Sequence, residues 1–234
     1  MSAATDVIAR VARETDSALL FHSATGKDSL VMLDLMAPYF RQIVCVYMYM
    51  TPNLRSVNKY IKWSECRYPN ARFIQCPHFN LTSWVKTGYL GITQNTRQPL
   101  LNLAKITDKA RECTGIEWAF YGMKEADSLN RRIMLRTYDD GICWKSKKAY
   151  PLHLYKTKDM VRYIKEHNIL PNATYGAQGM SSGENPASWS YLLWLRENYP
   201  DDLDRVFAMF PDCRRILFEY DEMVAGEQAD IEGE

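Results

Sequence analysis

A strand–loop–helix pattern near the start of the chain constrains its fold more than any other feature. An apolar run, Ala18–Phe21, leads into Ser23-Ala24-Thr25-Gly26-Lys27-Asp28-Ser29, and a second apolar run, Leu30–Leu33, follows. This order predicts a buried strand, a loop of small residues and a helix. Such a loop directs backbone N–H groups and the helix N-terminus toward one point, which suits a phosphate group. The alternative is an ordinary strand-to-helix turn capped by Asp28 or Ser29.

The side chains of this loop support the same chemistry. Ser and Thr hydroxyls are hydrogen-bond donors, Lys27 adds a positive charge, and Gly26 allows the backbone to approach a ligand closely. The seven loop residues are therefore candidates for nucleotide binding: Ser23, Ala24, Thr25, Gly26, Lys27, Asp28 and Ser29.

Short apolar strands alternate with helical segments along the first 170 residues. We expect strands at 18–22, 43–50, 72–76 and 117–121, and helices at 7–13, 28–36, 55–66, 101–113, 158–167 and 186–198. This alternation predicts an α/β fold with a doubly wound, mainly parallel sheet that carries helices on both faces. The last of these helices is expected to begin at Pro186, with Asn185 as its N-cap.

Three parts of the chain are expected from these patterns and the changes in composition. Residues 1–170 form the α/β nucleotide-binding domain, and residues 171–220 form a loop and a small, mostly helical extension of it. Polar, glycine-containing residues predict an irregular excursion at 80–99 within the first part. Residues 221–234 contain acidic side chains and no Lys or Arg, which predicts a disordered tail.

A second cluster of charges follows the last predicted strand. The segment from Gly122 to Arg132 contains three cations, Lys124, Arg131 and Arg132. Because ligands of parallel sheets bind beyond the carboxyl ends of the strands, this cluster and the first loop are expected to face one place. The alternative is a solvated helix face, since Lys124, Asp127 and Arg131 have the spacing of a surface ion-pair row.

Composition excludes several classes of protein. A net charge of +1 shows no overall field for nucleic acid, and no apolar run approaches the ~20 residues that span a bilayer. The N-terminus lacks an apolar signal core, so we expect a cytoplasmic protein without a membrane partner. Six isolated cysteines with no CxxC pair argue against a zinc ribbon or an iron–sulfur cluster and favour free thiols.

With both charge clusters considered together, the chain resembles the phosphoadenosine phosphosulfate (PAPS) reductase family of the PP-loop, or adenine nucleotide α-hydrolase-like, superfamily. It is also similar to the small subunit of bacterial ATP sulfurylase. Residues 20–33 resemble the PP-loop and its helix, and residues 122–132 resemble Gly-x-Arg-x-x-(Glu/Asp)-Ser-x-x-Arg, with Lys124 at the first Arg. Residues 151–164 resemble the family's Pro-Leu/Ile…Trp-Thr-x-x-Asp segment, with Tyr155 at the Trp, and the loop at 172–183 is similar to Tyr-x-x-Gly…Ser-x-Gly.

The resemblance implies ATP or PAPS as the ligand. The phosphates would contact residues 23–29, and the adenine would lie near the end of the second strand at Met48, Tyr49 and Met50. The second element implies further nucleotide contacts, namely Gly122, Lys124, Asp127, Ser128, Arg131 and Arg132. Lys27 and Arg131 would neutralise charge during catalysis, and Asp28 would be the candidate ligand for Mg²⁺.

The chain also departs from the family pattern. PAPS reductases use a C-terminal Glu-Cys-Gly-x-His segment, which is missing; Cys213, next to Arg214 and Arg215, is the only C-terminal cysteine. Those arginines could lower its pKa and make it catalytic, although a packing role is the more common one for a lone cysteine. The paired cysteines that hold an iron–sulfur cluster in adenylyl-sulfate reductases are missing too. The loop Ser23–Ser29 either has one extra residue or carries Ala24-Thr25 in place of Ser-Gly.

These features leave three functional hypotheses. The first is adenylyl transfer at the α-phosphate of ATP, with release of pyrophosphate. The second is a thiol-dependent PAPS reductase that uses Cys213 or the thiol of a thioredoxin-like partner. The third is a non-catalytic nucleotide-binding or scaffold protein, with a link to phage or DNA modification known only through the family. A homodimer is the other partner that the sequence leaves open. His22 and His153 are expected to be hydrogen-bonded core residues rather than catalysts.

Overall fold

The computed structural model describes residues 2–170 and 184–232, with side chains to residue 226. The chain divides into two compact units, each of which is discontinuous in sequence. The first comprises Met1–Met48, Val57–Cys76 and Leu103–Ala173, and the second comprises Tyr49–Ser56, Pro77–Asn102 and Thr174–Glu234. This division differs from the predicted one, because two segments before residue 170 belong to the second unit.

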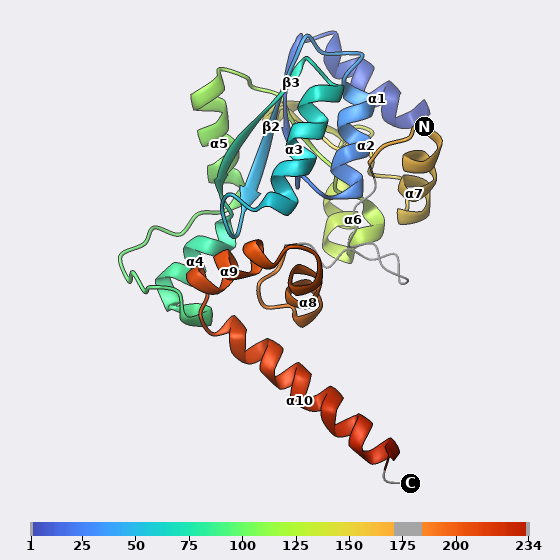
Figure 1. Cartoon of the computed structure of the whole chain (residues 1–234). Helices are drawn as coiled ribbons and strands as arrows, with labels where there is room; N and C mark the ends of the chain where they lie inside the picture. The colour runs from blue at the N-terminus through green and yellow to red at the C-terminus, as the bar shows by residue number, and fades with distance from the viewer. Residues whose placement is uncertain (1, 171–183, 233–234) are drawn as a thin grey trace. The chain divides into compact units, whose positions relative to one another are not determined.

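The first unit contains a six-stranded sheet in the order β3-β2-β1-β4-β6-β5 (Figure 1). The pairs β1/β2, β1/β4 and β4/β6 are parallel, and β5/β6 is antiparallel. The strands are β1 (Ser17–Phe21), β2 (Gln42–Tyr49), β3 (Ala71–Pro77), β4 (Ala119–Tyr121), β5 (Ile142–Cys143) and β6 (Lys148–Ala149). The predicted mainly parallel α/β fold is confirmed.

Helices flank the sheet, and the handedness of the crossover connections shows which face of the sheet α2, α3 and α5 cover. The path β1–α2–β2–α3–β3 moves in one direction along the sheet, whereas α5 leads back across it to β4. Because parallel crossovers are right-handed, α2 and α3 cover one face and α5 the other. The helices are α1 (Ser2–Ala12), α2 (Lys27–Met36), α3 (Arg55–Arg67), α5 (Leu103–Thr114), α6 (Leu129–Leu135) and α7 (Thr157–Glu166). Short 3-10 turns lie at Glu125–Asp127 (η2) and Trp144–Ser146 (η3).

The core of this unit explains why the predicted elements form. Apolar residues of α1 and α2, among them Ile8 and Leu33, are fully buried with strand residues such as Leu20 and with Met160 of α7. The strand β1 is buried on both faces, as expected for a central parallel strand. Phe21 pairs in register with Tyr121 of β4, and their rings stack at 4.8 Å. The loops that follow β1 and β4 therefore start at the same level of the sheet.

The second unit is helical. It contains α4 (Phe79–Thr87), the short turn η1 (Tyr89–Gly91), α8 (Trp189–Asn198), α9 (Pro200–Met209) and α10 (Cys213–Glu232). Trp84 of α4 contacts Phe210 edge-to-face at 5.5 Å, and the N–H of Asp212 donates to the carbonyl of Leu90 at 3.2 Å. The buried carboxylate of Asp202 accepts the backbone N–H groups of Arg55 and Ser56 at 2.8 and 2.7 Å. These contacts join segments that are far apart in the sequence.

Three predicted details of this unit are wrong. Within the predicted irregular excursion, α4 forms because His78 caps its N-terminus and Gly88, at φ 73°, ends it. Helix α8 begins at Trp189 rather than Pro186, since the Asn185 side chain accepts from Ala187 N in a turn before the helix. The predicted disordered tail is helical through residue 232, and Asp221 is anchored by a bidentate ion pair with Arg196.

Candidate functional site

The loop between β1 and α2 is closed by its own hydrogen bonds. The Ser23 N–H donates to Ser29 Oγ at 3.1 Å, and the two serine hydroxyls are 3.0 Å apart. Ala24 N–H donates to Nδ1 of His22 at 2.9 Å, and Thr25 N–H to the Ser23 carbonyl at 2.6 Å. The first three N–H groups of the loop therefore already have acceptors, whereas the sequence predicts that they are free for a ligand.

His22 stabilises the conformation of this loop. Ala24 has φ 55°, a left-handed conformation that is costly for a residue with a side chain, and His22 Nδ1 accepts its N–H. Because Nδ1 is an acceptor, the proton lies on Nε2, which is buried and finds no hydrogen-bond partner in the part of the chain that the structure describes. Complete burial lowers the pKa of His22 to about 3. The sequence predicts a hydrogen-bonded core histidine here, and this is confirmed, but its contact with the loop was not foreseen.

The start of α2 remains the part of this segment best placed for an anion. Gly26 is its N-cap and has no side chain that could accept the N–H groups of the first turn. The N–H groups in the first turn of a helix, which here includes Asp28 and Ser29, have no intrahelical acceptor. A Cβ atom on Gly26 would lie 2.1 Å from Ser23 Oγ, so the loop closes this tightly only around glycine.

The segment after β4 meets α2 through a buried ion pair. Lys124 is 2% exposed, and its Nζ lies 2.5 Å from Oδ2 of Asp28 and 3.3 Å from Oδ1 of Asp127. Gly122 brings the two backbones together, because a Cβ atom there would lie 3.3 Å from Asp28 Cβ. The expectation that the two charge clusters meet is confirmed. The ion pairs of the alternative row, Lys124–Asp127 and Asp127–Arg131, are also present. The row is not solvated at Lys124, which is buried and has its closest partner 96 residues away in the sequence.

These contacts form an alternating network of charges. Lys27 Nζ lies 3.8 Å from Asp28 Oδ2, and Arg131 donates to Asp127 at 2.7 Å. Partial burial opposes ionisation of Asp127, but hydrogen bonds and charge from Lys124, with help from Arg131, hold its pKa below the usual value. The network of three cations and two carboxylates has a net charge of +1, with Lys27 at one end and Arg131 at the other.

The other predicted nucleotide contacts lie on α6 and at the end of β2, outside the charge network. Ser128 caps α6 by accepting the Arg131 N–H at 3.2 Å, and Arg132 is exposed on the same helix. Met48 belongs to the first unit, whereas Tyr49 and Met50 belong to the second. The structure therefore groups residues 23–29 with 122–132 and assigns two of the three predicted adenine contacts to another unit.

Asp28 does not fit a direct Mg²⁺ ligand in this arrangement. Its Oδ1 atom is buried and has no hydrogen-bond partner among the described residues, which by itself would suit a cation. However, Oδ2 is bound by the ammonium of Lys124, and Asp127 is engaged by Lys124 and Arg131. Among the described residues, no three His, Cys, Asp or Glu side chains are grouped as metal ligands. The cations of the chain therefore take the place that a metal ion would hold beside Asp28.

Cys213 lies in the second unit, in the first turn of α10. It is fully buried, and its thiol donates to the carbonyl of Pro186 at 3.2 Å. Burial, with a smaller contribution from Asp212, raises the pKa of the thiol to about 12, opposite to the predicted lowering by Arg214 and Arg215. Arg214 instead lies over the ring of Phe207 at 4.8 Å. This environment favours the neutral thiol of a packing residue.

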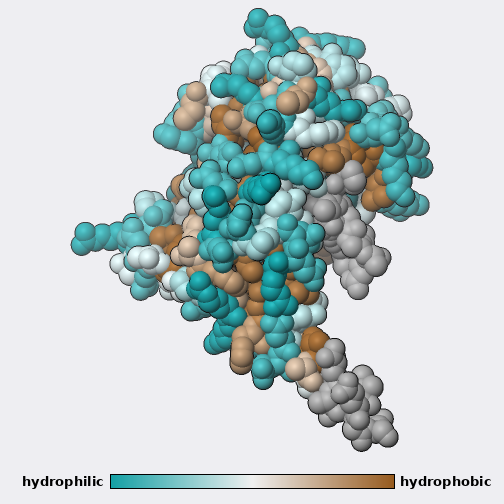
Figure 2. Space-filling model, viewed as in Figure 1, coloured by the Kyte–Doolittle hydropathy of each residue, from teal (hydrophilic) through white to brown (hydrophobic). Residues whose placement is uncertain are grey.

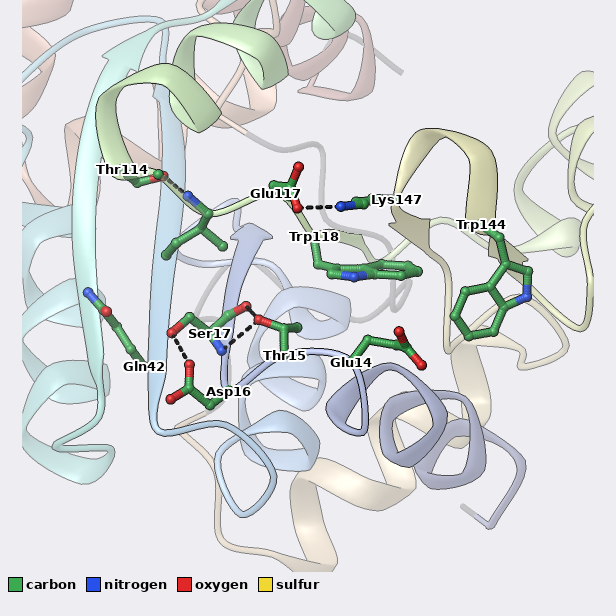
Figure 3. Close-up of a pocket in the computed structure, with 12 residues that line it drawn as sticks. Glu14, Thr15, Asp16, Ser17, Gln42, Thr114, Glu117, Trp118, Trp144 and Lys147 are labelled. Carbon is green, nitrogen blue, oxygen red and sulfur yellow. Dashed lines mark hydrogen bonds and ion pairs between the residues drawn. The ribbon is translucent and has the colours of Figure 1, made fainter.

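A cavity of about 540 Å³ lies at the opposite, amino-terminal edge of the sheet (Figure 3). Figure 3 shows Trp118 between the Glu117–Lys147 ion pair and Thr15, with Gln42 at the far side. The carboxylate of Asp16 is held by Ser17 and Arg41. None of the predicted site residues lines this cavity, so it is separate from the loop and its charge network.

The comparison with protein families agrees with the geometry at the carboxyl ends of β1 and β4. The family model of the phosphoadenosine phosphosulfate reductase domain matches residues 18–200. The chain belongs to this family. The match includes β1, its loop and the charge network, as the resemblance of residues 20–33 and 122–132 implied. No curated protein sequence matches the chain significantly.

Three solved structures that are similar to the chain share little sequence with it. A PAPS reductase from Candida auris, in a phosphate complex, is 14% identical with a TM-score of 0.49, over 77% of this chain and 86% of that one. The U34-tRNA thiolase NcsA from Methanococcus maripaludis, with its [4Fe-4S] cluster, is 12% identical with a TM-score of 0.43, over 92% and 78%. An NH3-dependent NAD synthetase from Campylobacter jejuni, with nitrate, is 10% identical with a TM-score of 0.46, over 89% and 90%.

Within the described residues, every helix is too short or too polar to cross a bilayer.

Proposed function

We propose that this PAPS reductase-family protein binds an adenine nucleotide at the start of α2 and transfers its adenylyl group to an acceptor, releasing pyrophosphate. The observation that carries the proposal is the network Lys27–Asp28–Lys124–Asp127–Arg131, which holds cations in fixed positions at the first turn of a helix. Cations held in place beside a helix N-terminus suit phosphate groups better than mobile surface charges do.

Binding would use three kinds of donor. The first-turn N–H groups of α2 would contact phosphate oxygens, while Lys27 and Arg131 would supply charge from the two ends of the network. Arg132 is exposed one residue further along and could add a guanidinium fork. The adenine would lie toward the end of β2 at Met48. Ser23 and Thr25 would become available if the ligand replaced the internal bonds of the loop.

The chemistry follows from where charge develops. A nucleophilic oxygen of the acceptor forms a bond to the α-phosphorus, the bond from that phosphorus to the bridging oxygen breaks, and the electron pair leaves with pyrophosphate. Lys27 and Arg131 would stabilise the charge on the leaving group. Lys124 would act as a positioning residue, since its ammonium holds Asp28 and Asp127 rather than facing a ligand.

The reductase hypothesis has less support from this chain's own thiol. A reductive step on PAPS needs a thiolate that attacks sulfur, and Cys213 is buried with its pKa raised to about 12. A thioredoxin-like partner would have to supply the thiol instead. Thioredoxin-dependent release of sulfite from PAPS tests this alternative, and equal activity of Cys213→Ser would remove Cys213 from it.

The main experiment measures exchange of labelled pyrophosphate into ATP, together with thermal shifts by ATP and by PAPS. A nucleotide at ~100 times its Kd should stabilise the fold by about 2.7 kcal/mol. Lys27→Ala should abolish both signals, whereas Lys62→Ala, an exposed lysine on α3, should leave them unchanged. A shift without exchange for any sulfate-like or nucleic-acid acceptor would identify a non-catalytic nucleotide-binding protein. The absence of any shift would contradict both enzymatic hypotheses.

A further inference from the structure

The cavity at the amino-terminal edge of the sheet has an aromatic wall that is anchored from outside. Trp118 is 5% exposed, and its ring meets the ring of Trp144 at 5.4 Å and 89°. The Trp144 indole N–H donates to Asp139 at 2.8 Å, and the Arg10 guanidinium lies over the Trp144 ring at 5.6 Å. Two indole rings at right angles therefore line a cavity of about 540 Å³, a size that suits a small molecule.

The Trp118 side chain carries a polar atom without a partner. Its Nε1 makes no hydrogen bond with the described residues, although the residue is almost fully buried. A buried indole N–H normally has an acceptor. The ring lines the cavity, and Figure 3 shows it above Thr15 and Glu14. A ligand in the cavity that carries an acceptor group would satisfy this donor.

The side chains that line the cavity have an excess of negative charge. One cation, Lys147, stands against three carboxylates, those of Glu14, Asp16 and Glu117. Lys147 pairs with Glu117, and Asp16 is paired by Arg41. The Glu14 carboxylate makes no ion pair or hydrogen bond with the residues that the structure describes. The cavity therefore favours a positively charged ligand, with one carboxylate that still lacks a counter-ion.

The composition of the wall favours an organic cation over a metal ion. Among the described residues, no three His, Cys, Asp or Glu side chains are grouped closely enough to hold a metal together. Alkylammonium groups, in contrast, are attracted to the faces of aromatic rings, and most strongly to Trp. Arg10 already makes such a contact with Trp144. The amide of Gln42, at the far side of the cavity in Figure 3, adds a neutral polar group.

We propose that this cavity binds a small organic cation that has an alkylammonium head and an uncharged, hydrogen-bonding tail. The head lies between the ring of Trp118 and the carboxylate of Glu14. The tail extends toward Gln42 and accepts a hydrogen bond from Trp118 Nε1. None of these side chains belongs to the nucleotide site proposed at α2, so either proposal can fail while the other holds.

The first test is a nuclear magnetic resonance titration of the full chain with acetylcholine, which carries an alkylammonium head and a carbonyl acceptor. The assigned indole N–H resonance of Trp118 should shift and reach saturation. The uncharged isostere, in which carbon replaces the quaternary nitrogen, should bind at least about tenfold more weakly because it loses the cation–π contact and the attraction to the carboxylates. The absence of a saturable shift at millimolar acetylcholine, or equal binding of the isostere, overturns the proposal.

The second test locates the cationic head. Glu14→Gln keeps the shape of the side chain but removes its charge, so it should raise the Kd for acetylcholine at least about threefold. Glu112→Gln, which changes another exposed carboxylate outside the cavity, is the matched control and should leave the Kd unchanged. Both variants should keep the thermal midpoint of the wild type. An unchanged Kd in Glu14→Gln, or an equal loss in Glu112→Gln, contradicts the proposed position of the head.

Discussion

Charged side chains gather at both edges of the sheet, and the most deeply buried of these among the described residues, Lys124, lies at the carboxyl-terminal edge. At the carboxyl-terminal edge, Lys124 is 2% exposed and joins Asp28 to Asp127. At the amino-terminal edge, Arg41 and Asp16 pair while their side chains are 80% and 60% exposed. Exposed pairs contribute little because water screens them, whereas buried charges depend on their partners. Burial, rather than the number of charges, therefore distinguishes the edge where we propose that the nucleotide binds.

The largest effect should come from removing the buried ammonium. Lys124→Met removes the closest partner of Asp28 Oδ2, while Oδ1 has no hydrogen-bond partner among the described residues. We expect a loss of about 3 kcal/mol in the free energy of unfolding, measured with urea at pH 7. Lys147→Met, at the amino-terminal edge, is the matched control and should change it far less. Equal losses in the two variants would contradict the contrast between the edges.

Acidification should destabilise the carboxyl-terminal edge through His22. Its folded pKa of about 3 lies below the ordinary value of 6.5, so the unfolded chain binds more protons as pH falls between these values. Stability is therefore complete above pH 6.5 and decreases toward pH 3, with a loss of about 2 kcal/mol between pH 7 and 5. In His22→Asn the amide oxygen can accept the Ala24 N–H without titrating. This variant should lack that part of the pH dependence, and an identical slope in both proteins would argue against His22 as its source.

The tight loop predicts a size limit at Gly26. An added methyl group would meet Ser23 Oγ at 2.1 Å, so Gly26→Ala should cost about 1–2 kcal/mol of stability. The same change in a Ser23→Ala background, where the hydroxyl is gone, should cost markedly less. A double-mutant cycle measured by urea unfolding gives this coupling. Additive effects of the two substitutions would show that the loop relaxes without the contact.

The smallest effect is expected at the amino-terminal edge. Glu117 pairs with Lys147 in solvent, and the hydrogen bond and charge of that lysine lower its pKa. Glu117→Gln should leave the thermal midpoint within experimental error at physiological salt, because an exposed pair is screened. A clear loss of stability would mean that this edge is as strongly ordered as the one at Asp28.

Much of the first unit was predictable because its signals are local. The run Ala18–Phe21 before a small-residue loop is sufficient to predict β1, the loop and α2, since a central parallel strand is apolar on both faces. Helix α4 was missed because it has only nine residues and two of them, Leu81 and Thr82, are buried, so its periodicity is weak. Gly88 after its last turn was the signal that could have indicated it.

The C-terminal part was predicted less well because composition does not show which side chains contact each other in the fold. An acidic segment without Lys or Arg is typical of disorder, but Asp221 binds Arg196, which lies 25 residues earlier on α8. Cys213 likewise lies next to two arginines in the sequence, but the fold buries its thiol against Pro186. Neighbours in the sequence did not reveal either environment.

The sequence by itself determined the first four strands, the mainly parallel fold, the family, and the two segments where a phosphate-binding site was to be sought. Periodicity, glycine and charge are local properties, so they can be read without a fold. Only the tertiary structure decided that Lys124 is buried against Asp28, that His22 holds the loop at Ala24, and that Trp118 lines a cavity. Each of these depends on which distant elements pack together, and packing sets the desolvation and the hydrogen-bond partners that decide what a charged side chain can do.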